Sequence, residues 1–385
     1  MRELDDRLSL LQAQMREWSG ELRERALELD RTPDDVGTLL DVPALRYLAT
    51  MLIPADRQPS PLTIGPYRYD GISCAERVVA LEELASADAA AVLAAPGPSL
   101  SGVIVGQLAD EAQKEWFYER MLTAPRWTFF ALTEPGQGSN AGRLTTRLRR
   151  DGDSGDWRLS GMKRYVGGAT RADVGVVVAR RSDGPLGITA VLVDTSLPGF
   201  AAAALPTVGL RAAGLSAITL RDVPVSEERL LGRHLPATRR GINAVVRTFH
   251  QFRPGVAGLA LGVARSAHDY VVTHRRTLRA AERHRLDELK DRIHAVRQLV
   301  RHAAARVDAD PSDGALGSVA KVRAVELAEH ATALAPRFFG PGARIDHPLL
   351  DKLARDAWGL EFMEGTSHMQ KLAYVNSHLK DRLTR

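Results

Sequence analysis

The chain has 385 residues, of which 44% are hydrophobic and 26% are charged. This composition excludes an intrinsically disordered or fibrous protein, and the length predicts two or three domains or one large multilayer unit. The 52 Lys and Arg residues outnumber the 47 Asp and Glu residues by only five. Such a small and diffuse positive charge, without aromatic residues interleaved among the basic ones, argues against a nucleic-acid-binding protein.

The sequence also predicts a compartment. Cys74 is the only cysteine and cannot form an intramolecular disulfide, which is typical of proteins from a reducing cytoplasm. The first residues are charged from Arg2 onward and lack the apolar segment of a signal peptide. An uncharged stretch at 89–109 is long enough for a membrane helix, but a Pro-Gly-Pro sequence at 96–98 interrupts it. We therefore expect two helices there, no membrane insertion and a cytoplasmic protein.

Three regions follow one another along the chain. Residues 3–124 repeat leucine at three- and four-residue spacing between charged residues, which predicts helices, with a turn-rich segment at 54–71. Between about 126 and 232, short β-branched segments bounded by Gly, Asp or Pro predict antiparallel strands in a small sandwich or barrel. From about 236 the pattern is helical again, with a break at 308–314. The expected fold class is α+β, with an N-terminal helical domain (1–125), a middle antiparallel β-domain (126–234) and a C-terminal helical bundle (235–385).

The sequence lacks the motifs of several enzyme classes. Its eleven histidines form neither an HExxH motif nor a cluster with cysteine, so we expect no metal site. A Gly-x-Ser-x-Gly elbow and a Walker loop are also absent from the sequence. The glycines at 136, 138 and 142 do not have the GxGxxG spacing and follow no βαβ unit, which argues against a Rossmann dinucleotide site.

Two segments could nevertheless carry chemistry, and the first is residues 131–140, ALTEPGQGSN. It places two glycines and a serine directly after a predicted strand. Such a loop exposes backbone N–H groups and a hydroxyl, and can bind a phosphate or the polar edge of a flavin. The same residues are also typical of a plain hairpin loop, and the local sequence does not decide between the two interpretations.

The second segment surrounds Glu364, which follows several apolar residues and precedes the helix-breaking Gly365. A carboxylate in apolar surroundings has a raised pKa, as a general base acting on a weak carbon acid requires. A solvated glutamate at a helix end is the alternative interpretation. Glu361, one helical turn earlier, is a competing candidate for the base. The apolar neighbours of Glu364 are Trp358, Leu360, Phe362 and Met363.

These segments resemble those of the acyl-CoA dehydrogenase family, flavoproteins that oxidise acyl thioesters to α,β-unsaturated products. The resemblance covers nearly the whole chain. Its most specific part is the pair of motifs LTEPGxGS (132–139) and RDA…EGTS (355–367), which lie about 220 residues apart. The resemblance implies the architecture of that family, in which a helical domain, a β-domain and a four-helix bundle follow one another. It also implies FAD as the cofactor.

The resemblance gives each motif residue a role. Glu364 would remove the α-proton of the thioester while the β-hydride passes to the flavin. Phe130, Leu132 and Thr133 would contact the flavin ring, and Ser139 would reach the pyrophosphate. The complete set of implied FAD contacts is Phe130, Leu132, Thr133, Gly138, Ser139, Tyr165, Val166, Gly167, Arg337, Gly340, Thr366 and His368.

Several positions depart from the pattern of the family. Tyr165 stands in place of a tryptophan beside the flavin, Gly167 in place of a threonine and His368 in place of a glutamine. In the family, a partner subunit contacts FAD through a Gln-x-x-Gly-Gly-x-Gly turn. Residues 337–342 correspond to this turn, but its glutamine is missing and a proline replaces its second glycine. The Arg-x-x-Phe-Gly partner loop is missing. Three arginines are candidates to replace its arginine: Arg275, Arg276 and Arg279.

The resemblance predicts an oxidoreductase acting on a thioester of coenzyme A or of an acyl carrier protein. The unrecognisable acyl-pocket segment around residues 40–70 favours a specialised biosynthetic role on a carrier protein, whose acidic surface would suit a basic chain. The electron acceptor would be an electron-transfer flavoprotein or oxygen. A homodimer or homotetramer is expected, because partner residues complete the FAD site of the family. The alternatives are a flavin-dependent monooxygenase or N-oxygenase, which would not need Glu364, and a non-catalytic binding protein.

Overall fold

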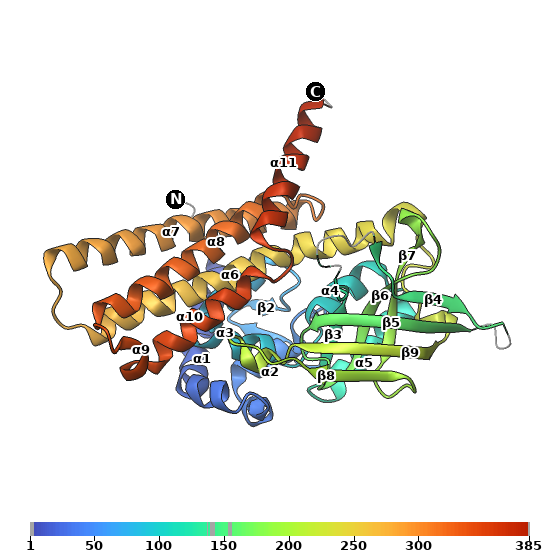
Figure 1. The fold of residues 1–385 in the computed structure, drawn as a ribbon, viewed down its shortest axis with the longest axis horizontal. Coiled ribbons are helices and arrows are strands. Elements are labelled where there is room, and N and C mark those ends of the chain that lie inside the picture. Colours follow the sequence, from blue (N-terminus) through green and yellow to red (C-terminus); the bar gives the residue numbers. More distant parts are fainter. Residues whose placement is uncertain (1–3, 137, 139–142, 153–155, 384–385) are drawn as a thin grey trace.

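The computed structural model describes residues 4–136, 138, 143–152 and 156–383, in which helices come first, then strands, then helices again (Figure 1). The first helices are those expected from the leucine spacing. They are α1 (Asp6–Arg31), α2 (Pro43–Thr50), α3 (Cys74–Ala94), α4 (Ser99–Leu108) and α5 (Glu111–Thr123). The segment predicted to be turn-rich also contains a short hairpin of β1 (Leu62–Ile64) and β2 (Tyr67–Tyr69).

The uncharged stretch at 89–109 forms the end of α3 and the whole of α4. Between these helices Gly97 has a φ of +129°, and a Cβ there would lie 2.6 Å from the carbonyl oxygen of Leu48. Only glycine fits this conformation and this close approach. The predicted break between two helices is therefore confirmed. Within the described ranges, no helix is long and apolar enough to cross a membrane.

The described strands of the middle part form one sheet with the order β3-β6-β4-β5-β9-β8, and β7 pairs with β6. Their alternating buried residues fill a core of their own, which includes Leu159, Val177 and Val191. The strands are β3 (Trp127–Ala131), β4 (Arg147–Arg150), β5 (Trp157–Val166), β6 (Ala172–Arg180), β7 (Ile188–Asp194), β8 (Phe200–Ala204) and β9 (Ser216–Val225).

The prediction of an antiparallel β-domain is wrong for two strand pairs. β6 runs parallel to β3 and to β4, whereas the pairs β4–β5, β5–β9, β6–β7 and β8–β9 are antiparallel. The β4–β5 hairpin lies between β3 and β6 in the chain, so a long crossover returns the chain to the same end of the sheet. The residue pattern of a strand does not specify which other strand it pairs with, so the two parallel pairs could not be predicted from the sequence.

The chain then returns to helices. α6, α7, α8 and α10 lie side by side as a bundle, and α11 projects from the body of the molecule (Figure 1). α6 continues through Pro254 and is the longest of the described helices. The helices are α6 (Ile242–His274), α7 (Ala280–Ala309), α8 (Ala315–Leu334), α9 (Ala343–Asp346), α10 (Pro348–Glu361) and α11 (Ser367–Leu383).

The first and the last helices share one hydrophobic core. α3 packs along α6, where a Cβ at Gly262 would lie 2.7 Å from the carbonyl oxygen of Glu82, so the two backbones approach closely. Buried residues from α1, α3, α6, α7, α8 and α10 contribute to this core. It fixes α6, which runs from the bundle to the β-domain (Figure 1).

A buried polar cluster ties α10 to the rest of the molecule. Lys352 Nζ donates to Asp88 Oδ1 and to Asp356 Oδ2, each at 2.6 Å, and all three side chains are buried. Asp88 interrupts the helical geometry of α3, and Asp356 Oδ1 accepts a hydrogen bond from Leu210 N at 2.6 Å. Leu210 lies between β8 and β9. The Arg-Asp-Ala part of the motif thus holds α10, and the turn that follows it, against the β-domain.

Candidate active site

Glu364 lies in a turn between α10 and α11. It has a φ of +52° and is followed by Gly365 with a φ of +98°, so the chain reverses sharply. Side chains of three helices hold the carbonyl groups of this turn. Arg253 Nε donates to Glu364 O at 3.3 Å, Gln370 Nε2 to Glu364 O at 2.8 Å, and Lys321 Nζ to Gly365 O at 3.0 Å. The backbone of Glu364 is therefore fixed from α6, α8 and α11.

The carboxyl group of Glu364 is withdrawn from water, although the residue as a whole is only half-buried. Burial raises the pKa of this carboxyl group to about 7, and the positive charges of Arg253 and Lys321 act in the opposite direction. A carboxyl group with such a pKa is partly ionised at neutral pH and can both accept and release a proton there. The raised pKa expected from the sequence is present.

From the sequence, the raised pKa of Glu364 is attributed to the apolar residues just before it, but these residues do not surround its carboxyl group. Trp358 and Phe362 are 52% and 72% exposed, and Leu360 belongs to the main hydrophobic core. Their side chains therefore do not enclose the carboxyl group together. The residues that sequence reasoning missed are Arg253, Lys321 and Gln370, which come from distant parts of the chain and have no local signal.

Glu361 has a different environment from Glu364. Its two carboxylate oxygens accept hydrogen bonds from Ser367 N at 2.7 Å and from Ser367 Oγ at 2.6 Å. Lys321 Nζ lies 3.7 Å from Glu361 Oε2 and donates to Glu361 O at 2.6 Å. A carboxylate bonded to the first N–H groups of a helix stabilises that helix. Glu361 thus fixes the start of α11, and Glu364 is the better candidate for the base.

The loop after β3 is held by a buried ion pair. Lys163 Nζ of β5 donates to Glu134 Oε1 and to Leu132 O, both at 2.9 Å. Glu134 also accepts hydrogen bonds from Thr145 N and Thr145 Oγ1, both at 2.6 Å, and from Thr146 N at 2.9 Å. The buried side chain of Glu134 therefore anchors the Leu-Thr-Glu-Pro part of the motif, while Leu132 and Thr133 stay partly accessible.

Electrostatics explains why this pair is stable inside the protein. Burial alone would raise the pKa of Glu134, but hydrogen bonds from Thr145 and Thr146 and the charge of Lys163 outweigh it and hold the pKa at about 2. Burial lowers the pKa of Lys163 to about 8, against the attraction of Glu134. The sequence contained a signal for this pair, because Lys163 continues the inward-facing alternation of Trp157 and Leu159 and therefore needs a buried partner.

The β3 loop and the Glu364 turn meet on one face of α6. The ring of Phe130 in β3 packs edge-on against Phe249 of α6, with 6.1 Å between the ring centres. Arg253, which bonds to Glu364 O, follows Phe249 by four residues and therefore projects from the same helix face. Segments that are about 230 residues apart in the sequence are thus brought to one site.

Two family models match the chain: the acyl-CoA dehydrogenase middle domain over residues 129–223 and the acyl-CoA dehydrogenase C-terminal domain over residues 239–377. The mitochondrial short-chain specific acyl-CoA dehydrogenase of Bos taurus is 30% identical over 286 residues, which are 71% of this chain and 68% of that protein. The chain belongs to the acyl-CoA dehydrogenase family.

Further comparisons agree with this assignment. Subunit CarC of the caffeyl-CoA reductase–Etf complex of Acetobacterium woodii is 28% identical over 79% of this chain and 82% of that protein. The fold is similar to that of butyryl-CoA dehydrogenase from Megasphaera elsdenii, with a TM-score of 0.83 and 23% identity over 98% of this chain and 100% of that one. The family resemblance inferred from the two motifs is confirmed, and with it the assignment to flavoprotein oxidoreductases with FAD as the cofactor.

The residues at the edge of the β-domain fit FAD, the cofactor of the family. Phe130, Leu132 and Thr133 are half-buried, and Tyr165 leaves 61% of its surface exposed at a φ of +61°. A Cβ added at Gly138 would meet no atom within 4 Å, so the loop has open space before it. An accessible aromatic and polar edge beside the segment that Glu134 and Lys163 anchor suits a flat ring with a phosphate tail.

The other residues expected to contact FAD differ in how accessible their side chains are. Gly167 is exposed beside Tyr165, but the side chain of Val166 is buried in the core of the β-domain, so only its backbone is available. Thr366 is half-buried and its Oγ1 accepts a hydrogen bond from Met369 N at 3.4 Å. His368 is exposed at the start of α11. The contact expected from Ser139 lies outside the described residues.

Arg337 and Gly340 are not brought to this site. They lie between α8 and α9, where Phe339 packs on Tyr270 near the end of α6. Phe249, which contacts Phe130, precedes Tyr270 by 21 residues, which corresponds to about 30 Å along a helix. Within one chain, these two residues are therefore remote from the flavin edge.

Proposed function

We propose that the chain catalyses the α,β-dehydrogenation of an acyl thioester, with Glu364 as the base. The observation that supports this most strongly is the turn at Glu364, which combines a pKa of about 7 with a backbone fixed from three helices. A base that takes a proton from carbon works best when its pKa is near the ambient pH and its position is fixed. Glu364 meets both conditions.

The residues of the chain divide the work of this reaction. Glu364 accepts the α-proton, and the nearby charges of Arg253 and Lys321 stabilise its ionised form beforehand. Phe130, Leu132, Thr133 and Tyr165 form the surface that holds the flavin ring, and Lys163 with Glu134 keeps that surface rigid. The hydride acceptor is supplied by the bound FAD.

The electron acceptor is proposed to be an electron-transfer flavoprotein. This proposal rests on the name of the CarC relative, which belongs to a reductase–Etf complex. The same name shows that a related chain acts in the direction of reduction. Because the pKa of Glu364 is about 7, both its forms are populated at neutral pH, and the redox partner can set the direction here.

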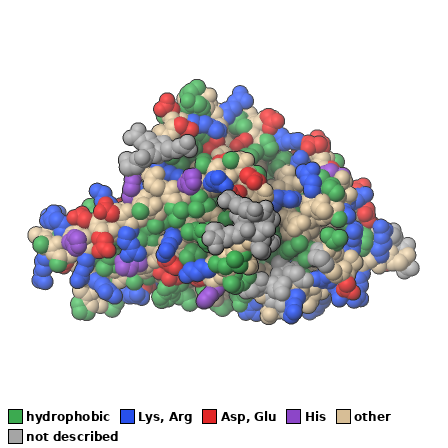
Figure 2. Space-filling model, turned by 90° about the horizontal axis from the view of Figure 1, so that it is seen from above, with side chains coloured by type: hydrophobic (Ala, Val, Ile, Leu, Met, Phe, Trp, Pro, Cys, Tyr) green, Lys and Arg blue, Asp and Glu red, His purple; other side chains and the backbone are tan. Residues whose placement is uncertain are grey.

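The carrier of the thioester is proposed to be an acyl carrier protein, in a specialised biosynthetic role. The net charge of +5 and the predominance of arginine support an acidic protein partner. On the face shown in Figure 2, Lys and Arg side chains are spread among acidic ones, so the attraction would be distributed over the surface. Turnover of coenzyme A and carrier-protein thioesters at equal rates would contradict this preference.

A homo-oligomer is proposed because the two ends of the FAD site lie apart in one chain. Arg337 lines a hollow of about 250 Å³ together with Arg285, Arg292 and His330. Among the described residues none of these arginines forms an ion pair, whereas Arg275 lies 3.6 Å from Glu282. We propose that this hollow accepts the phosphates of FAD from a second copy, and that Arg285 and Arg292 take the role for which Arg275, Arg276 and Arg279 were candidates.

The test is the visible absorption of the purified protein, followed by addition of acyl thioesters on coenzyme A and on a carrier protein. We expect a flavin spectrum that bleaches anaerobically with the right thioester. The rate of bleaching should rise as the pH passes upward through about 7, because ionised Glu364 is the active form. Oxygen consumption with an amine and a flavin reductase, without bleaching by any thioester, would favour the monooxygenase alternative. A colourless protein that cannot be reconstituted with FAD would favour the non-catalytic one.

A further inference from the structure

Strand β5 carries an irregularity at its end, next to the proposed flavin surface. Between Lys163 and Val166 its register with β9 shifts, so that Arg164 and Tyr165 together oppose the single residue Ala217. Side chains of a regular strand alternate between its two faces, whereas a bulge re-aims them. Here the bulge places Arg164 and Tyr165 in succession on the exposed side, although the residues on either side of them are buried.

The bulge is tied to the segment that follows β3. Arg164 N donates to Thr133 O at 2.9 Å. Tyr165 has a φ of +61°, an uncommon conformation for a residue other than glycine, which the surrounding structure has to hold in place. Thr133 and Tyr165 both belong to the surface proposed to hold the flavin ring. The backbone therefore fixes Arg164 at the edge of that surface.

The guanidinium of Arg164 is held at this edge by the ring of Tyr165. Its Cζ lies 5.3 Å from the centre of that ring. A guanidinium at this distance is attracted by the face of an aromatic ring and, being planar, can stack on it. Tyr165 leaves 61% of its surface exposed and Arg164 is exposed as well. The pair thus presents a positive charge to a group that covers the tyrosine.

Within the described part of the chain, no carboxylate compensates this charge. Arg164 forms no ion pair there, whereas the neighbouring Lys163 is paired with Glu134 at 2.9 Å. Both carboxylate oxygens of Glu134 are already used, because they accept hydrogen bonds from Lys163, Thr145 and Thr146. The charges of Lys163 and Glu134 cancel each other, so Arg164 supplies the net positive charge at the bulge.

We propose that Arg164 raises the reduction potential of the bound flavin and thereby favours oxidation of the thioester over the reverse reaction. A hydride carries two electrons and one proton, so its transfer turns the neutral oxidised ring into a singly negative one. A positive charge beside the ring stabilises the negative form much more than the neutral form. The inference rests on the proposed function, because it takes Thr133 and Tyr165 as flavin contacts and the thioester as the hydride donor.

The experiment measures the midpoint potential of the FAD-loaded protein by anaerobic reductive titration against a reference dye, without any thioester. Arg164→Met removes the charge and should shift the equilibrium ~5- to 50-fold toward the oxidised flavin, the range for a unit charge acting across a protein surface. At about 30 mV for each tenfold change in a two-electron couple, this fold-change lowers the potential by ~20–50 mV. The difference should shrink at high ionic strength, because Arg164 is exposed.

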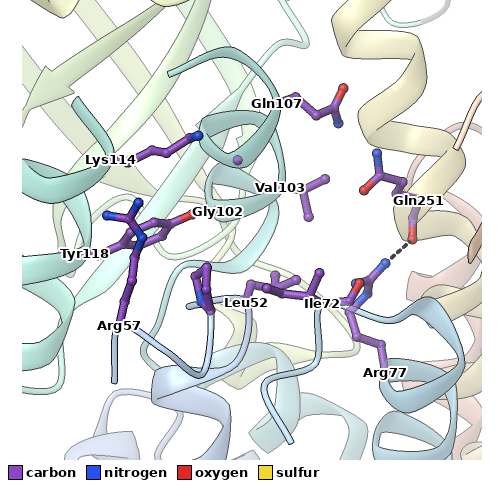
Figure 3. Close-up of a pocket in the computed structure, with 12 residues that line it drawn as sticks. Leu52, Arg57, Ile72, Arg77, Gly102, Val103, Gln107, Lys114, Tyr118 and Gln251 are labelled. Atoms are coloured by element: carbon purple, nitrogen blue, oxygen red, sulfur yellow. Dashed lines mark hydrogen bonds between the residues drawn. The ribbon is translucent and has the colours of Figure 1, made fainter. Parts of the chain in front are cut away.

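Further variants separate charge from structure. Arg164→Lys keeps the charge and should hold the potential close to that of the wild type, while Arg164→Glu should lower it about twice as far as Arg164→Met. The matched control is Arg57→Met. Arg57 also lies over a tyrosine, with its Cζ 5.8 Å from the centre of the Tyr118 ring, but in a pocket of about 300 Å³ lined by residues other than the flavin contacts (Figure 3). Its loss should leave the potential unchanged, because Glu111 neutralises it.

The possible outcomes separate this inference from the proposed function. Equal potentials in the wild type and Arg164→Met, with bleaching by a thioester intact, would overturn the inference and leave the dehydrogenase function standing. A shift in Arg57→Met or Arg164→Lys as large as that in Arg164→Met would overturn it too, because the charge beside the flavin would not be the cause. The expected order of potentials without bleaching by any thioester would support the effect of Arg164 on the flavin and contradict the dehydrogenase function.

Discussion

Exchanging Glu364 for glutamine keeps the size of the side chain and removes its capacity to accept a proton. We expect Glu364→Gln to slow flavin bleaching by ~10²–10⁴-fold. The thioester should still bind and perturb the flavin spectrum, and the FAD content should stay unchanged, because the proposed flavin surface lies on the β-domain. Stopped-flow absorption with the preferred thioester measures all three quantities.

Glu361→Gln is the matched control for this prediction. Because Glu361 accepts its hydrogen bonds from Ser367, the substitution should lower the free energy of unfolding by about 0.5–2 kcal/mol and leave bleaching within ~10-fold of the wild-type rate. Wild-type bleaching in Glu364→Gln together with its loss in Glu361→Gln would show that the base is assigned wrongly. Activity in both variants would favour the oxygen-using alternative over the dehydrogenase.

The raised pKa of Glu364 also affects stability. Its folded-state pKa of about 7 lies above the value of 4.5 for an unperturbed glutamate, so the folded state binds more protons between these pH values. The contribution of Glu364 to the free energy of unfolding therefore falls as the pH rises from about 4.5 to 7. We expect Glu364→Gln to be as stable as the wild type at pH 4.5 and more stable by about 1–3 kcal/mol at pH 8. Urea unfolding at the two pH values measures this difference. If the free energies of unfolding of the variant and the wild type differ by the same amount at both pH values, the prediction is contradicted.

Among the elements, the β3 loop depends most on a partner from another strand. Glu134→Gln leaves the ammonium group of Lys163 buried without its counter-charge, which should cost about 3–5 kcal/mol and reduce FAD content. The double variant with Lys163→Met removes both charges and should recover much of the stability. Differential scanning calorimetry and the ratio of visible to ultraviolet absorption measure the two effects. If the double variant is less stable than Glu134→Gln alone, the ion pair is not the origin of the loss.

The same elements show what the sequence could predict. The leucine spacing and the Pro-Gly-Pro sequence identified α3 and α4, because helix periodicity and proline act locally. The strands β3, β5, β6, β7 and β9 were visible in the same way. The parallel pairing of β6 with β3 could not be predicted, and neither could the hydrogen bonds of Arg253 and Lys321 to the Glu364 turn. These contacts join residues 40 or more positions apart, and no local pattern encodes such a choice of partner.

For the whole molecule, the proposed oligomer requires a contact surface between subunits, and we expect α11 to contribute to it. Leu372, Val375 and Leu379 are 57%, 52% and 51% exposed, and their spacing puts them on one face of this projecting helix. We expect Val375→Asp with Leu379→Asp to shift the protein toward monomers and to lower FAD content. Light scattering over a range of concentrations measures the oligomeric state.

The control is Ala373→Asp, which adds a charge about 100° around the helix from Leu372. It should leave both the oligomeric state and the FAD content unchanged. A wild-type protein that is monomeric and fully loaded with FAD would contradict the proposed contribution of Arg337 and its neighbours from a second copy.

The close packing of α3 against α6 bears on how the chain matures on the ribosome. The last residue of α3 is made 180 positions before the last residue of α6, and the whole β-domain is synthesised in between. At ~5–20 residues per second, α3 waits about 10–35 s for the helix that covers it. Its many buried alanines and valines are uncovered during that time. The nascent N-terminal helices are thus the part of this protein for which chaperone protection during translation matters most.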